Sequence, residues 1–195
     1  MPIFLSYAIA GWSGFFVMSV ELLGGRLLAP TFGSSVYVWG ALITVFMLAL
    51  SIGYLAGGRW STRSPSVARL GAILIVAALT IAPMLFAGAT LLDAIAGVVP
   101  DPRFGSLLGA TALFFVPTVF SGMISPYAVR LIVRERDTSG RHAGQLYFVS
   151  TFGSAAGTLL TSFYFVLWFD VNHILIGLAA ISCVLGVLAL SSGRK

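Results

Sequence analysis

The chain is 195 residues long, 58% of its residues are hydrophobic, only 9% are charged, and its formal net charge is +5. Soluble domains carry about 25% charged residues, so this composition excludes a soluble globular enzyme and predicts a protein embedded in a lipid bilayer. The single cysteine, Cys183, excludes a disulfide framework and a cysteine-based metal cluster. We interpret the positive charge as a determinant of membrane topology and expect no nucleic-acid partner.

Six apolar segments follow one another along the chain. A helix needs roughly 20 apolar residues to cross a bilayer, and helices are expected there because lipid cannot satisfy the polar groups of the backbone. The sequence therefore predicts an all-α, six-helix transmembrane bundle that forms a single domain over residues 1–195. The predicted spans are 3–29, 36–58, 68–92, 104–133, 143–168 and 173–191.

The first segment contains an acidic residue, Glu21, about two turns before its predicted outer end. A carboxylate is costly in hydrocarbon, so such a group faces the interior of the bundle, finds a partner or is protonated. Two interpretations stay open. Either Glu21 forms a structural ion pair with Arg26 or Arg130, or it is an acidic ligand or proton site.

The second segment ends in the string Gly53-Tyr-Leu-Ala-Gly-Gly-Arg59-Trp-Ser-Thr-Arg63. Its glycines allow close contact between helices, and its arginines favour a cytoplasmic end. The string resembles a degenerate form of the loop between the second and third helices of major facilitator transporters, with Gly58 where that motif carries Asp.

We expect residues 93–103, between the third and fourth segments, to form a short interfacial piece at the outer surface. The fourth segment contains Pro117 and Pro126, which predict a kinked helix. Arg130, near its inner end, has two interpretations. It extends to the membrane surface as an anchor, or it holds an anionic group or a loop carboxylate at the cytoplasmic mouth.

The fifth segment is crowded with small residues, and Gly153 and Gly157 have the spacing that lets two helices approach closely. We favour tight packing inside the bundle as the explanation. The alternative is a mobile gate helix or a dimer seam.

The basic residues predict the orientation of the bundle. With six spans, every Lys and Arg except Arg26 and Arg103 falls on one side, and that side is expected to be cytoplasmic. Both termini are then cytoplasmic. We expect a multi-pass protein of the bacterial cytoplasmic (inner) membrane.

Signatures of soluble enzymes are absent from the sequence, including nucleotide-binding glycine loops and zinc-protease or hydrolase motifs. The two histidines, His142 and His173, are predicted on opposite sides of the membrane, which argues against a metal or haem site. We therefore assign no catalytic residue, metal or cofactor, and we expect the chain not to be an enzyme.

Three stretches carry a family resemblance. They run from Glu21 to Gly40, from Ser51 to Arg59, and from Ser121 to Arg130 followed by Gly144 to Thr158. Together they are similar to the membrane domain of bacterial transmembrane spermidine-synthase-like proteins, in which a major-facilitator-like segment is fused to an aminopropyltransferase. The resemblance implies half of a major facilitator fold. Because the sequence ends at Lys195, we expect the catalytic domain to be absent, and catalysis does not carry over.

Three functional hypotheses follow. The first is a transporter-like protein for a polyamine or related small cation, acting alone, as a homodimer or within a larger assembly, because a carboxylate and aromatic faces suit an alkylammonium ligand. The second is a non-catalytic anchor or scaffold for a soluble aminopropyltransferase-like partner, and the third is an accessory subunit of a larger membrane complex. The candidate ligand-binding residues are Glu21, Arg26, Tyr37, Tyr54, Tyr127, Arg130, Gln145 and Tyr147.

Overall fold

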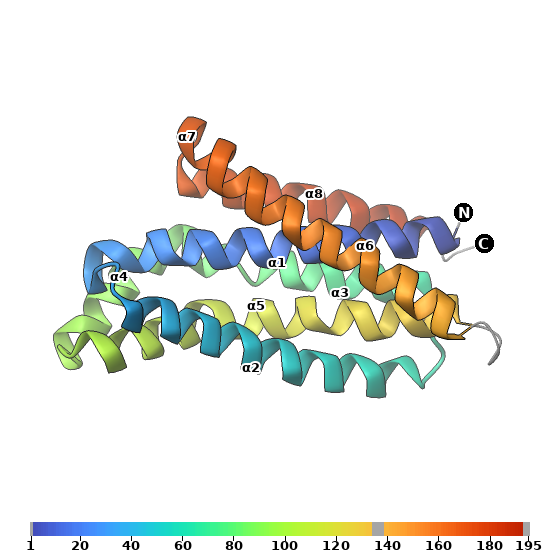
Figure 1. Ribbon diagram of the computed structural model, residues 1–195, viewed down its shortest axis with the longest axis horizontal. Helices are drawn as coiled ribbons and strands as arrows, with labels where there is room; N and C mark the ends of the chain where they lie inside the picture. The colour runs from blue at the N-terminus through green and yellow to red at the C-terminus, as the bar shows by residue number, and fades with distance from the viewer. Residues whose placement is uncertain (1, 134–138, 193–195) are drawn as a thin grey trace.

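The computed structural model describes residues 2–133 and 139–192, and every regular element within them is a helix. The helices lie alongside one another in an elongated bundle (Figure 1). In chain order they are α1 (Pro2–Phe32), α2 (Val36–Ser61), α3 (Val67–Leu79), α4 (Ala82–Val98), α5 (Pro102–Ile132), α6 (Ser139–Leu160), the π-helix η1 (Thr161–Phe165), α7 (Val166–Trp168) and α8 (Val171–Ser192). The predicted all-α class is confirmed for these residues.

Five helical stretches are long and apolar enough to cross a membrane, namely Ile3–Phe32, Val36–Ser61, Val67–Val98, Pro102–Ile132 and Val171–Ser192. The predicted fifth span, 143–168, is helical but is not among them. Its glycine, serine, threonine and glutamine residues lower its hydropathy. The chain is thus a multi-pass helical protein with five clear candidate spans.

Two segments differ from their predicted form, and each difference has a local cause. The first helix continues through Pro30 to Phe32, and Gly33 ends it with a φ of 80°, a left-handed conformation that glycine adopts without steric cost. The third predicted span, 68–92, lies within the candidate span Val67–Val98, but that span consists of two helices. It breaks at Thr80 and Ile81, because Pro83 in the first turn of α4 has no N–H to continue the hydrogen-bond ladder.

Residues 93–103, predicted as a short interfacial piece, do not form a separate element. Asp93 lies within α4, which runs on to Val98, and α5 begins at Pro102, so only three residues connect the two helices. Asp101 caps α5 by accepting a hydrogen bond from the backbone N–H of Arg103 at 2.9 Å. Both Pro117 and Pro126 lie inside α5, which is one continuous helix.

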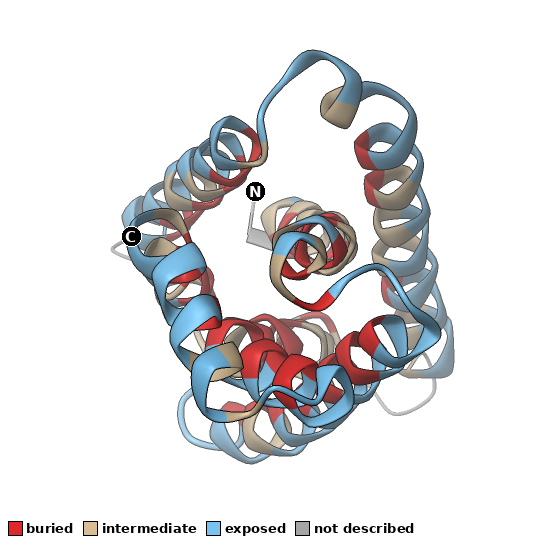
Figure 2. Cartoon of the chain, turned by 90° about the vertical axis from the view of Figure 1, so that its left-hand side faces the viewer, coloured by how far each residue is buried: buried red, intermediate tan, exposed pale blue. Residues whose placement is uncertain are grey.

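Helix α1 is the central element of the bundle. It contacts α2, α3, α4, α5, α6 and α8, and in the end-on view it lies in the middle with the other helices around it (Figure 2). Two buried apolar clusters surround it, one around Phe114 and Phe46 and the other around Tyr127 and Leu70. Many side chains on the outer helices are exposed and apolar, including Phe86, which is 87% exposed, as expected for surfaces that face lipid.

The packing of the helices repeats within the chain. The closest pairs are α2 with α5, α1 with α6, and α3 with α8. A Cβ on Gly53 would meet the Val119 carbonyl of α5 at 2.3 Å, and a Cβ on Gly153 would meet the Gly11 carbonyl of α1 at 2.0 Å. The α2/α5 and α1/α6 interfaces therefore use glycine in the same way.

Further contacts match between the α2/α5 and α1/α6 interfaces. Gly57 of α2 lies against Met123 of α5, and in the other interface Gly157 of α6 lies against Phe15 of α1. Gly14 lies against the Ser150 carbonyl as Gly122 lies against the Leu50 carbonyl.

The correspondence relates α1, α2 and α3 to α5, α6 and α8. Helices α1 and α5 run in opposite directions, since Phe32 at the end of α1 contacts Gly105 at the start of α5. Gly71 of α3 and Gly186 of α8 contact each other's carbonyl groups. The two halves of the bundle are therefore related by an approximate two-fold axis that inverts one half relative to the other.

Candidate functional site

A small polar cavity lies where α1, α2, α5 and α6 meet, between the two apolar clusters. Its volume is about 80 Å³, which is room for several water molecules. Hydroxyl groups and small residues dominate its lining, which consists of Ser13, Gly14, Val17, Met18, Leu50, Tyr54, Ser121, Gly122, Ser125, Ser150 and Ser154. A hydroxyl-lined cavity within so apolar a bundle is the strongest candidate for a ligand site.

The lining of this cavity comes in pairs from the two halves of the bundle. Ser13 corresponds to Ser121 and Gly14 to Gly122. The Ser13 hydroxyl donates a hydrogen bond to the Ser121 carbonyl at 3.2 Å, which joins α1 directly to α5. The other corresponding pairs are Val17 with Ser125, Leu50 with Ser150, and Tyr54 with Ser154. The cavity therefore lies on the approximate two-fold axis.

The serine hydroxyls present oxygen lone pairs to the cavity. Ser121 donates its hydroxyl hydrogen to the Pro117 carbonyl at 2.9 Å, and Ser154 donates to the Ser150 carbonyl at 3.1 Å. A hydroxyl has one hydrogen to donate and two lone pairs to accept with. Once the hydrogen is held by the backbone, the remaining oxygen suits a hydrogen-bond donor such as water or an ammonium group.

No protein-family model, curated protein or solved structure matches this chain. The cavity must therefore be interpreted from its own residues.

Glu21 lies close to this cavity along α1. It follows Val17 and Met18, which line the cavity, by one helical turn, and it precedes Gly25, which lies against the Trp39 ring of α2. Residues three or four apart share a helix face, so Glu21 is on the α1 face that forms the cavity. Its side chain is half-buried.

Neither predicted ion pair of Glu21 forms within the described residues. The one ion pair among them joins His173 to Asp170 at 3.5 Å, at the start of α8. Arg26 and Arg130 are both exposed. The carboxylate of Glu21 is thus left without a basic partner in this part of the chain, which favours the ligand or proton interpretation over the structural one.

Tyr54 and Tyr147 are the predicted aromatic residues that belong to this region. Tyr54 lines the cavity from α2, and Tyr147 of α6 lies near Tyr54 but is not part of the lining. Gln145 lies half a turn earlier on α6, where its Oε1 accepts a hydrogen bond from the Tyr7 hydroxyl at 3.2 Å. Gln145 therefore links α6 to α1 and does not line the cavity.

The remaining predicted residues lie elsewhere. Tyr127 is fully buried, and its hydroxyl accepts a hydrogen bond from the Ser66 backbone N–H at 3.3 Å, so it secures the connection between α2 and α3. Tyr37 is at the opposite end of the bundle, with the Arg103 guanidinium 4.7 Å from its ring centroid. That ring already has a cationic partner within the protein.

Sequence analysis missed the five serines of the cavity. Ser121 and Ser125 belong to a stretch that it singled out only for its family resemblance, and Ser150 and Ser154 to one where the small residues were interpreted as packing. Gly153 and Gly157 do pack on α1, so that interpretation is confirmed. The missing signal was the correspondence between segments, since Ser13 and Ser121 lie in different segments, 108 residues apart in the chain.

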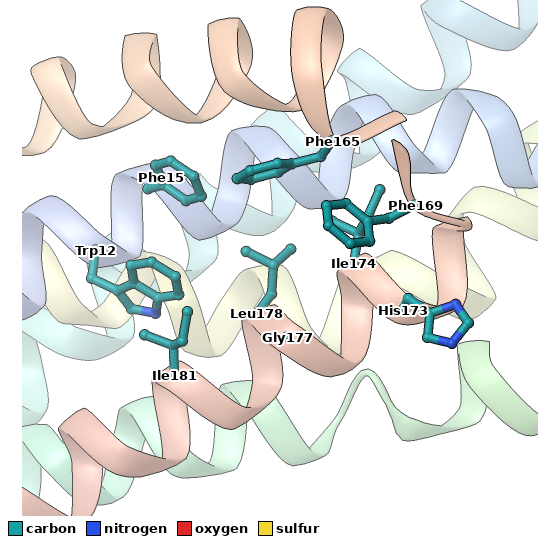
Figure 3. Close-up of a pocket in the computed structure, with 9 residues that line it drawn as sticks. All are labelled: Trp12, Phe15, Phe165, Phe169, His173, Ile174, Gly177, Leu178 and Ile181. Carbon is teal, nitrogen blue, oxygen red and sulfur yellow. The ribbon is translucent and has the colours of Figure 1, made fainter. Parts of the chain in front are cut away.

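A second cavity is an apolar groove between α1, η1 and α8, with a volume of about 300 Å³ (Figure 3). Trp12 and Phe15 stack with centroids 5.1 Å apart on one side, and Phe165 lies across from them. The Trp12 indole N–H donates to the Ser182 hydroxyl at 2.7 Å and is thereby satisfied. Apart from His173 at one end, the side chains that line this groove are apolar, so it suits hydrocarbon better than a polar ligand. Within the described residues, no three His, Cys, Asp or Glu side chains gather as metal ligands.

Proposed function

We propose that this chain is a transporter-like protein of the bacterial cytoplasmic membrane that moves a small cation, with a polyamine or related alkylammonium ion as the substrate class. The observation that carries the proposal is the hydroxyl-lined cavity on the axis between two inverted halves. Many transporters bind substrate near the midplane of the membrane, at the interface between inverted repeats, and alternate access by movement of one repeat against the other.

The chemistry of the site favours a cation. The serine oxygens accept hydrogen bonds, Tyr54 adds an aromatic face, and Glu21 supplies a negative charge one turn along α1. A carboxylate in a membrane segment is retained at a considerable energetic cost, so an unpaired one is by default a functional group. Its counter-charge in the working protein is then the substrate or a proton.

The proposal includes six crossings of the membrane, with α6, η1 and α7 as the fifth. The small residues that lower the hydropathy of α6 face α1. Its outward side chains are large and apolar, such as Phe148 and Phe152, which are 69% and 67% exposed. The ends of α2 and α5 and the starts of α3 and α6 lie at the end of the bundle where α1 begins (Figure 1). Arg59, Arg69 and Arg141 therefore gather at one end, consistent with a cytoplasmic surface.

Cysteine labelling tests this topology. In a variant without Cys183, single cysteines at Ser64 and Pro100 should react with a membrane-impermeant reagent from opposite sides of the membrane. Reaction of both from the same side would contradict the six-span arrangement and with it the inverted relation of the two halves.

Uptake into proteoliposomes tests the function. Purified protein should accumulate labelled spermidine or putrescine under a membrane potential or a proton gradient. Glu21→Gln should reduce uptake to the level of empty liposomes, because it keeps the shape of the side chain and removes its charge. Asp170→Asn, at an exposed carboxylate just before α8, is the matched control and should retain uptake.

The absence of uptake of either polyamine under any gradient would overturn the transport proposal. Stable co-purification with a separately encoded soluble aminopropyltransferase-like protein would then favour the scaffold alternative.

A further inference from the structure

The connection between α2 and α3 carries a second candidate site, at the arginine-rich end of the bundle. Two crevices open there on either side of Trp60, which is 51% exposed. Arg63 borders both of them. This region is separate from the serine cavity and plays no part in the proposed transport step.

Side-chain hydrogen bonds, in addition to the backbone hydrogen bonds of α2 and α3, hold the connection in place. The Arg69 guanidinium donates to the carbonyl groups of Arg63 and Ser64. The Ser66 hydroxyl caps α3 by accepting from the Arg69 N–H at 3.2 Å, and the Ser66 N–H donates to Tyr127. The backbone that presents Arg63 is therefore preorganised.

The smaller and more enclosed of the two crevices combines a basic rim with an apolar wall. Arg63 and Arg69 lie at the rim with Trp60, and Ile73, Val76 and Phe120 line the wall, enclosing about 330 Å³. On the other side of Trp60, Arg59 and Arg63 border an open crevice with Met123 at its base. An anion with an attached hydrocarbon chain fits both the basic rim and the apolar wall, whereas a free anion would contact only the rim.

The charge at this end has no internal counterpart among the described residues. The guanidinium groups of Arg59 and Arg63 form no ion pair there. Of the described carboxylates, Glu21 lies within α1 and Asp93 within α4, while Asp101 and Asp170 directly precede α5 and α8, which begin at the opposite end of the bundle. Basic residues at the cytoplasmic surface attract anionic lipids, and a tryptophan at the same level favours the headgroup region.

We propose that this crevice binds one anionic phospholipid, with its phosphate against Arg63 and Arg59 or Arg69 and one acyl chain along the wall formed by α3 and Phe120. The lipid would fill the gap between the ends of α2, α3 and α5 and join the bundle to the inner leaflet.

Native mass spectrometry of the detergent-solubilised full chain tests the proposal, with phosphatidylglycerol, phosphatidylcholine and inorganic phosphate as probes. The wild-type protein should retain phosphatidylglycerol in preference to phosphatidylcholine. Arg63→Gln should weaken phosphatidylglycerol binding about fivefold, since one basic residue near an anionic surface contributes about that factor. Arg141→Gln, at an exposed guanidinium at the start of α6 and the same end of the bundle, is the matched control and should bind as the wild type does.

A second variant tests the wall independently of charge. Val76→Trp, at a position 37% exposed to the surroundings, should fill the crevice and weaken phosphatidylglycerol binding without changing the net charge. Thermal unfolding of each variant in detergent controls for loss of fold. Equal weakening by Arg63→Gln and Arg141→Gln would overturn the proposal in favour of diffuse charge attraction. If inorganic phosphate displaced the lipid and Val76→Trp did not change phosphatidylglycerol binding, the proposal would be overturned in favour of a free-anion site.

Discussion

The α1/α6 and α2/α5 interfaces are corresponding regions of the two halves, and they differ where the cavity forms. Both are close-packed through glycines that lie against the partner's backbone, Gly153 on α1 and Gly53 on α5. At the cavity, however, α2 contributes the bulky Tyr54 where α6 contributes Ser154, and α1 contributes Val17 where α5 contributes Ser125. The halves share a packing scheme and have divergent site chemistry.

The two interfaces also differ in the regularity of their helices. Helix α2 continues without a break to Ser61, whereas α6 loosens into the π-helix η1 after Leu160. At that point the Thr161 hydroxyl donates to the Ser19 hydroxyl of α1 at 2.9 Å, in a buried position. Single π turns inside α-helices are frequent at functional sites. The two interfaces therefore differ in that only α6 changes its helix type where it meets α1.

The largest expected effect on stability comes from substitutions that disrupt the glycine packing shared by the two interfaces. Gly53→Ala and Gly153→Ala each place a methyl group within 2.3 Å or less of a backbone carbonyl on the neighbouring helix, which should destabilise the fold by about 1–3 kcal/mol. Thermal unfolding in detergent, followed by tryptophan fluorescence, measures the loss. Gly58→Ala and Gly144→Ala, where a Cβ would meet nothing within 4 Å, are the controls and should be neutral. A neutral Gly153→Ala would mean that α1 and α6 do not pack as described.

An intermediate effect is expected from removing the chemical difference between the halves. Ser125→Val gives α5 the residue that α1 has at the corresponding position and removes one acceptor from the cavity. We expect polyamine uptake to fall on the order of fivefold, since one hydrogen bond contributes about 1 kcal/mol, with little change in stability. Thr111→Val, at an exposed position on the same helix, is the control. Equal uptake by Ser125→Val and the wild type would remove Ser125 from the binding site.

The smallest effect concerns the hydroxyl contact at η1. A double-mutant cycle with Ser19→Ala and Thr161→Val should give a coupling of about 0.6 kcal/mol, the average for hydrogen bonds between membrane helices. Ser61→Ala should be nearly silent, because the Ser61 hydroxyl donates to the Gly58 carbonyl of its own helix at 2.7 Å. A coupling of zero between Ser19 and Thr161 would show that η1 is not anchored to α1 by this contact.

The sequence by itself determined the helical class, the approximate position of each segment and the concentration of arginines at one end. These properties depend on hydrophobicity and on residue types within one segment, which lipid and backbone hydrogen bonding constrain directly. It also identified Gly153 and Gly157 as a packing face, because small residues four apart have few other uses in such a helix.

The tertiary structure alone decided which segments meet. Ser13 and Ser121 are far apart in the chain, and nothing near either residue indicates that they join at a cavity on a two-fold axis. Likewise, only the packing distinguished the candidate site residues from one another. Glu21 has no basic partner in the described residues, whereas Tyr127 contacts Ser66 and Tyr37 contacts Arg103. A binding site of this kind depends on the register between helices, and that register is set by contacts across the bundle and not by the composition of any one segment.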